Sequence, residues 1–157
     1  MKIKMMVIGK TSASWLEEGI ALYRKRLQHY CDFELEVIPD IKGGGSLEIP
    51  KLKELEAQSF LKKLTPRDTV ILLDENGKEF TSEGFAKRLN LWNDRGEKNL
   101  VFIVGGAFGF GNALHEKASL KISLSPMTFS HQMVRLIFVE QLYRGFTIIK
   151  GEPYHHK

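Results

Sequence analysis

Short apolar segments alternate with longer amphipathic segments along most of the chain, which predicts strands that alternate with helices. The clearest strands are two almost entirely apolar runs, "DTVILLD" at 68–74 and "NLVFIVGG" at 99–106. Such runs are typical of strands covered on both faces, as in a parallel sheet. Three further strands are expected at 2–9, 33–38 and 121–124. The pattern therefore predicts an α/β fold, with a mostly parallel sheet flanked by helices.

Amphipathic segments between these strands predict the helices. The first helix is expected to run to about Tyr30 and to be capped by Ser12 or Ser14, because a serine oxygen accepts from free backbone N–H groups. Pro50 suits the first turn of a second helix, which extends to about Leu64. Further helices are expected at 82–93, after 111, and from about 130 to beyond 143.

Glycines mark the predicted turns. The segment "DIKGGGSLEI" at 40–49 is expected to be a mobile surface connection, since it has neither phosphate-loop nor dinucleotide-binding spacing. Asn76 and Gly77 are predicted to reverse the chain, because this dipeptide is the strongest signal for a tight turn.

The size and composition bound the possible classes of protein. A chain of 157 residues fits a single domain, 1–157, and no repeat or linker divides it. The net charge of +4 permits an anionic partner without requiring one. The lone Cys31 cannot form an internal disulfide, and no histidine pair has zinc-site spacing with a third ligand, so we expect no metal. Without a signal peptide or membrane span, the expected location is the cytoplasm.

The stretch "FIVGGAFGFG" at 102–111 combines a strand with a glycine loop and is followed by a helix-like segment. The dinucleotide fingerprint fails, because Leu114 stands where the third glycine is needed. A phosphate loop also fails, because Asn112 replaces the required lysine. Two interpretations stay open, a tight strand-to-helix turn in which glycine supplies positive φ, or a loop that brings its backbone close to a ligand.

The ends of three strands indicate where a ligand binds. In an open parallel sheet, ligands bind beyond the carboxyl ends of the strands. If the three strands are neighbours, Leu73, Gly105 and the loop 124–129 meet there. An apolar slot with free backbone groups suits an adenine ring better than a triphosphate.

Five motifs occur in order across the whole length: "VIGK", "LLDENGKEFTSEGFA", "FIVGGAFGFG", "SLSPMTFSHQMVRLIFVEQLYRGFTI" and "GEPYHHK". Together they closely resemble the bacterial ribosomal RNA large-subunit methyltransferase H family, small enzymes of the SPOUT superfamily. The resemblance implies an α/β fold with a C-terminal deep trefoil knot, a homodimer whose sites are completed near the partner chain, and S-adenosylmethionine as methyl donor. It also implies methylation of N3 of a pseudouridine in 23S rRNA on the assembled 70S ribosome.

The resemblance also implies which residues form the site. The positions that match its cofactor-binding motifs are Leu73, Gly105, Leu124, Ser125, Pro126, Met127, Thr128 and Phe129. Arg144, Tyr154 and His155 match positions that serve RNA binding and catalysis. The chain departs from the family pattern at Phe108, where a polar residue is frequent, and at Ser130, where proline is frequent.

The chemistry suggests a role for each of the three C-terminal residues. Methylation at N3 requires loss of a proton, and His155 is the first candidate base because a histidine is largely neutral near pH 7. Tyr154 would orient it, and Arg144 would contact a phosphate or base through its planar fork. The alternatives are a tail that only contacts phosphates, solvent as the proton acceptor, and a surface salt bridge for Arg144.

Two rival functions remain open on the sequence. One is a SPOUT methyltransferase with another RNA target, such as a tRNA base. The other is a ribosome-associated factor that binds the cofactor without catalysis. A phosphate-binding ATPase is disfavoured by the absent loop lysine.

Overall fold

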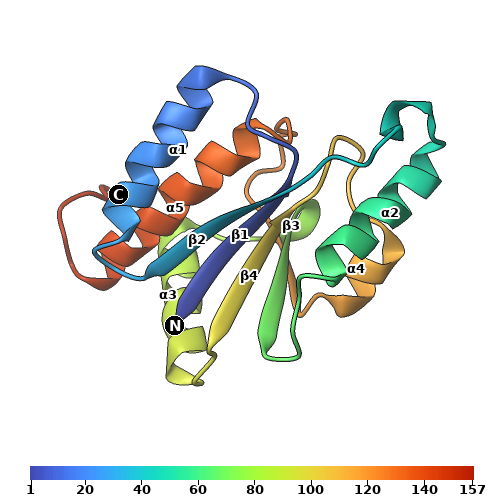
Figure 1. Cartoon of the computed structure of the whole chain (residues 1–157). Coiled ribbons are helices and arrows are strands. Elements are labelled where there is room, and N and C mark those ends of the chain that lie inside the picture. The colour runs from blue at the N-terminus through green and yellow to red at the C-terminus, as the bar shows by residue number, and fades with distance from the viewer.

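The computed structural model describes residues 1–157 and shows a five-stranded sheet with helices on both faces (Figure 1). The elements in chain order are β1 (Lys2–Ile8), α1 (Ser14–Leu27), β2 (Asp32–Ile38), the 3-10 helix η1 (Gly44–Ser46), α2 (Ile49–Leu61), β3 (Asp68–Glu79), α3 (Ser82–Asp94), β4 (Asn99–Val104), α4 (Asn112–Lys117), β5 (Leu120–Ser123) and α5 (Met133–Ile149).

The sheet has the strand order β2-β1-β4-β3-β5, and every neighbouring pair is parallel. This confirms the predicted α/β class. It also confirms that β3, β4 and β5 are neighbours, because Leu73 of β3 pairs with Val104 on one side and Ile122 on the other. The ends of these three strands therefore lie side by side. The trefoil knot implied by the resemblance stays a prediction.

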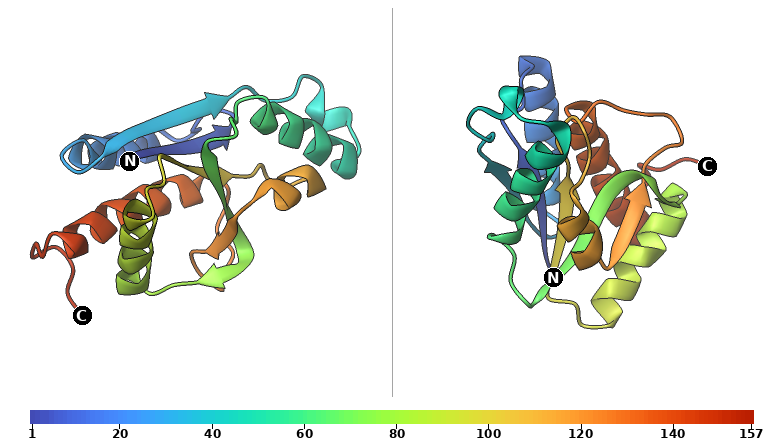
Figure 2. Two further views of the ribbon diagram at one scale, coloured as in Figure 1. Left: turned by 90° about the horizontal axis from the view of Figure 1, so that it is seen from below. Right: turned by 90° about the vertical axis from the view of Figure 1, so that its right-hand side faces the viewer.

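The sheet separates two apolar layers, because successive side chains of a strand point to opposite faces. Ile3, Met5 and Val7 of β1 belong to the layer under α1, α3 and α5, whereas Met6 and Ile8 belong to the layer under α2 and α4. Figure 2 shows these two groups of helices on opposite sides of the strands. All five side chains are at most 4% exposed, as expected for strands covered on both faces.

The tight turn predicted at Asn76 and Gly77 is wrong. Instead β3 continues to Glu79 and pairs with β5 on both sides of this dipeptide, with a register shift between Leu73 and Lys78. A Cβ at Gly77 would lie only 2.6 Å from the backbone carbon of Lys121. The glycine therefore allows two backbones to approach closely, and pairing with β5 overrides the local turn preference.

The first two helices end at Leu27 and Leu61, earlier than the predicted Tyr30 and Leu64, and two helix starts also differ from the prediction. The cap residue of α1 is Ala13, with no side-chain cap, so capping by Ser12 or Ser14 is wrong; the Ser12 N–H instead donates to Gln132 Oε1 at 2.9 Å. The last helix begins at Met133 rather than near Ser130, whose Oγ accepts from the Met133 N–H at 3.1 Å. None of the helices is long and apolar enough to cross a membrane.

Candidate active site

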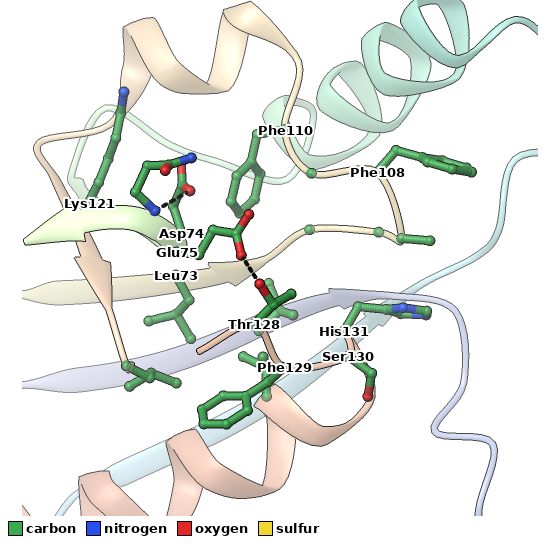
Figure 3. A pocket seen from close by; sticks show the side chains of 18 of the residues that line it. Leu73, Asp74, Glu75, Phe108, Phe110, Lys121, Thr128, Phe129, Ser130 and His131 are labelled. Carbon is green, nitrogen blue, oxygen red and sulfur yellow. Dashed lines mark hydrogen bonds between the residues drawn. The ribbon is translucent and has the colours of Figure 1, made fainter. Parts of the chain in front are cut away.

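A cavity of about 790 Å³ lies beyond the carboxyl ends of β3, β4 and β5 (Figure 3). Its volume lies within the range of small-molecule sites. Seven of the eight predicted cofactor residues line it, and Pro126 does not. The seven are Leu73, Gly105, Leu124, Ser125, Met127, Thr128 and Phe129.

The deep wall of this cavity is apolar. Leu73 ends the buried part of β3, and Val104 and Ile122 reach the cavity from the two flanking strands. The aromatic rings of Phe110 and Phe129 lie on opposite sides of the opening in Figure 3. Such walls suit a flat, weakly polar ring system.

The loop between β5 and α5 is held by its own hydrogen bonds. Ser123 Oγ donates to the Ser125 carbonyl at 2.8 Å, and the Met127 N–H donates to Ser125 Oγ at 2.9 Å. Thr128 Oγ1 donates to Glu75 Oε2 at 2.6 Å, which ties the loop to β3 (Figure 3). The Met127 side chain is 76% exposed at the rim. The loop is thus preformed, with its polar groups engaged and an apolar side chain at the entrance.

The glycine stretch after β4 forms a tight turn that also borders the cavity. The Gly109 N–H donates to the Gly106 carbonyl at 3.2 Å, and Gly109 has a φ of +88°, a conformation that favours glycine. Phe108 stands at the tip with 52% of its surface exposed. The two interpretations of this stretch are therefore compatible, because the turn itself presents its backbone to the cavity.

Arg144, Tyr154 and His155 come together near the C-terminus, which returns against α1 and α5 (Figure 1). Glu140 holds them, accepting from Arg144 Nη2 at 2.6 Å and from the Tyr154 hydroxyl at 3.0 Å. The His155 ring lies between Arg144 Nη1, 3.2 Å from Nδ1, and Glu83 Oε1, 3.1 Å from Nε2. We call these five residues the C-terminal cluster.

Hydrogen bonds and burial set the character of this cluster. A guanidinium only donates, so Arg144 Nη1 faces Nδ1 of His155 as a donor, while Nε2 lies against Glu83. Burial, together with hydrogen bonds to Tyr23 and Glu140, raises the pKa of Tyr154 well above its usual range. The hydrogen bond to Glu140 also raises the pKa of Arg144. The cluster thus combines a protonated phenol and a fixed cation with an imidazole held between Arg144 and Glu83.

The cluster does not reach the cavity of its own chain. The cavity touches α5 at Val134, and Arg144 follows ten residues later on the same helix. At 1.5 Å per residue, this spacing separates them by about 15 Å along the helix axis. A single chain therefore keeps its ligand cavity apart from the acid–base and cationic groups of the C-terminal cluster.

Several residues of the cavity and the cluster were not predicted. Glu140 precedes Arg144 by four residues, a helix spacing at which opposite charges pair. The sequence therefore contained a signal for this ion pair. His115 also lines the cavity. The fully buried Arg135 donates to the Ile8 and Gly9 carbonyls at 2.7 and 2.8 Å. No pattern in the sequence predicts that role. Nowhere do three His, Cys, Asp or Glu side chains gather as metal ligands would.

The fold and the cavity define a class of protein. The family described as "Predicted SPOUT methyltransferase" matches residues 1–155. A structure described as a probable methylase family protein from Haemophilus influenzae shares the fold, with a TM-score of 0.57 and 10% identity over 99% of this chain and 70% of that one. The chain is a SPOUT methyltransferase, and the methyl donor of that family is S-adenosylmethionine.

More similar relatives identify the family within this class. Proteins from Parabacteroides distasonis, Flavobacterium johnsoniae and Porphyromonas gingivalis are 54%, 53% and 45% identical over 157 residues, which cover all of both chains. Each is named ribosomal RNA large subunit methyltransferase H. The chain belongs to the ribosomal RNA large subunit methyltransferase H family.

Proposed function

We propose that the protein methylates N3 of a pseudouridine in 23S rRNA, acting as a homodimer on the assembled 70S ribosome in the cytoplasm. The observation that carries this proposal is similarity over the full length, at up to 54% identity, to relatives named as large-subunit rRNA methyltransferases. The cavity at the predicted strand ends supports it, because it fits the methyl donor of the class.

The residues present fit S-adenosylmethionine. Leu73, Leu124 and Phe129 give the apolar walls that an adenine ring needs, and the glycine turn brings backbone close to the rest of the ligand. When bound, the donor supplies a methyl group on a positively charged sulfur. The main task of the chain is then to place the target nitrogen in line with that methyl group, since positioning can contribute roughly 7–11 kcal/mol.

The C-terminal cluster supplies what the transfer needs at the base. Arg144 contacts an RNA phosphate, and as its Nη1 turns to that phosphate, Nδ1 of His155 becomes free to accept a proton. His155 would then accept the proton that N3 loses as it takes the methyl group supplied by the donor. Tyr154 and Glu140 keep Arg144 oriented.

A second copy of the chain completes the site in this proposal. The cavity and the C-terminal cluster of one chain are about 15 Å apart along α5, too far for His155 to serve the cavity beside it. A symmetric dimer presents the same surface from both chains, so two cavities each receive a cluster from the other subunit. Because each chain has a net charge of only +4, two chains together bind structured RNA more tightly than one.

A labelling experiment tests the target. The protein is incubated with methyl-labelled S-adenosylmethionine and with unmodified 70S ribosomes, 50S subunits, free 23S rRNA or tRNA. We expect label only on 70S ribosomes, at N3 of one pseudouridine, located by mass spectrometry of RNA fragments. Label on tRNA would move the target to another RNA. Binding of the donor without any label would leave a non-catalytic factor.

A further inference from the structure

A smaller hollow of about 290 Å³ opens beside the cofactor cavity, and we call it the annex. The two share the wall formed by Gly106, Ala107, Phe108 and His131. Figure 3 shows Phe108 and His131 together at one end of the cavity, away from Leu73 and Lys121. The other walls of the annex come from α2 and from the segment between β2 and α2. The annex therefore extends the cavity past the glycine turn.

Glu56 of α2 lines the annex and is only 8% exposed. Its carboxylate lies flat against the glycine turn, since a Cβ at Gly106 would be 2.7 Å from Oε2 and 2.9 Å from Oε1. Oε1 has no hydrogen-bond partner. A buried carboxylate oxygen without a partner costs free energy, which a donor placed beside it would offset.

Glu56 forms no ion pair within the protein. Arg135 donates to Ile8, Gly9, Thr11 and His131. Burial lowers the pKa of His131, which favours its neutral form. Burial, and then the charge of Asp40 on the annex wall, raises the pKa of Glu56. Burial therefore disfavours the charged form of Glu56, and a cation beside it would stabilise that form.

Lys53 lies one helical turn before Glu56 and lines the main cavity. It also forms no ion pair. Residues three apart are neighbours on a helix surface, about 5–6 Å apart at Cβ. One free cation and one free anion of α2 therefore flank the glycine turn, on the side where the cavity continues into the annex.

We propose that this face of α2 binds the amino-acid end of S-adenosylmethionine, with Glu56 accepting from its α-ammonium in the annex and Lys53 meeting its α-carboxylate. The amino-acid end carries one positive and one negative group on the same carbon, and α2 presents one group of each opposite charge. The remaining walls of the cavity then hold the adenosyl part. The proposal rests on donor binding in this cavity but not on the identity of the RNA target.

Binding calorimetry with three analogues of the donor, all with a neutral sulfur, separates the contribution of the α-ammonium from that of the α-carboxylate. S-Adenosylhomocysteine has both charged groups, its decarboxylated form has only the ammonium, and 5′-methylthioadenosine has neither. Glu56→Gln should weaken the first two by about 10-fold, the effect of losing one charge-assisted hydrogen bond, and leave methylthioadenosine unchanged. Lys53→Gln should weaken S-adenosylhomocysteine alone.

Exposed residues on the same helix provide matched controls. Glu54→Gln and Lys51→Gln each remove a charge of α2 away from the annex and should leave the binding of all three analogues unchanged. Equal weakening of methylthioadenosine by Glu56→Gln would overturn the proposal, because it would show that the carboxyl only supports the glycine turn. Unchanged binding of all three would also overturn it. If the wild-type protein bound none of the three analogues, that result would contradict binding of the methyl donor in this cavity.

Discussion

Glu140 organises the C-terminal cluster, since its Oε1 accepts from both Arg144 and Tyr154. We predict that Glu140→Gln lowers kcat for methyl transfer about 10- to 100-fold, because a misplaced guanidinium and imidazole lose their alignment with the target base. Single-turnover transfer to unmodified ribosomes measures the effect. Glu116→Gln, an exposed change on α4, is the control. An unchanged kcat would show that the cluster does not depend on this carboxylate.

Tyr154 is expected to act as a protonated phenol and not as a base. Its pKa is raised, so less phenolate exists at any pH from 7 to 9 than for an ordinary tyrosine. Tyr154→Phe keeps the ring that stacks on Arg144 and loses the hydrogen bonds that the hydroxyl makes with Glu140 and Tyr23. The rate should fall by less than about 30-fold, with the shape of its pH profile retained. A wild-type rate that climbs steadily with pH above 8, and a flat profile for the variant, would make Tyr154 the proton acceptor.

At the residue scale, the strand ends were predictable and the buried Glu56 was not. Leu73 and Gly105 follow apolar runs, so their place at the sheet edge is readable from pattern alone. Glu56 looks like any charged residue of a helix, because its burial depends on how α2 packs against the glycine turn. Long-range packing of this kind leaves no local signature.

At the scale of elements, β3 and β5 depend on their close approach at Gly77. We predict that Gly77→Ala lowers the free energy of unfolding by about 1–3 kcal/mol, because the added methyl group must push two backbones apart. Gly45→Ala is the control, since a Cβ there meets nothing within 4 Å. Urea unfolding measures both. Equal stability of the two variants would contradict the packing described for β3.

Arg135 ties the start of α5 to the end of β1. Arg135→Met removes the donors to the Ile8 and Gly9 carbonyls and should lower the free energy of unfolding by about 2–4 kcal/mol, the cost of leaving buried acceptors without partners. Arg135→Lys should recover part of this loss, because it restores one donor. Guanidinium unfolding curves measure the series. Unfolding energies within about 0.5 kcal/mol of wild type, as for an ordinary surface change, would contradict this role.

The elements show where local pattern holds and where it fails. The covered strands were recognisable because burial on both faces leaves no polar side. The turn predicted at Asn76 and Gly77 was wrong because their turn preference is local. Pairing with β5 depends on residues more than forty positions away. The start of α5 shifted to Met133 because Gln132 is engaged with the segment before α1.

At the scale of the whole molecule, alternating elements predict the class but not the strand order. The order β2-β1-β4-β3-β5 follows from packing that the pattern does not describe. It brings three strand ends to one cavity while α5 carries the C-terminal cluster away from it. The proposed reaction therefore needs a second chain, whose cluster would complete each cavity.

One measurement tests this dependence directly. Leu124→Arg blocks the cavity of one chain, and His155→Ala disables the cluster of another. The two variants are inactive alone and are co-expressed with different tags so that only the mixed dimer is purified. We predict about half of wild-type methyl transfer to unmodified ribosomes, because one of the two composite sites is intact. An inactive mixed dimer, or no mixed dimer at all, would contradict a site shared between two chains.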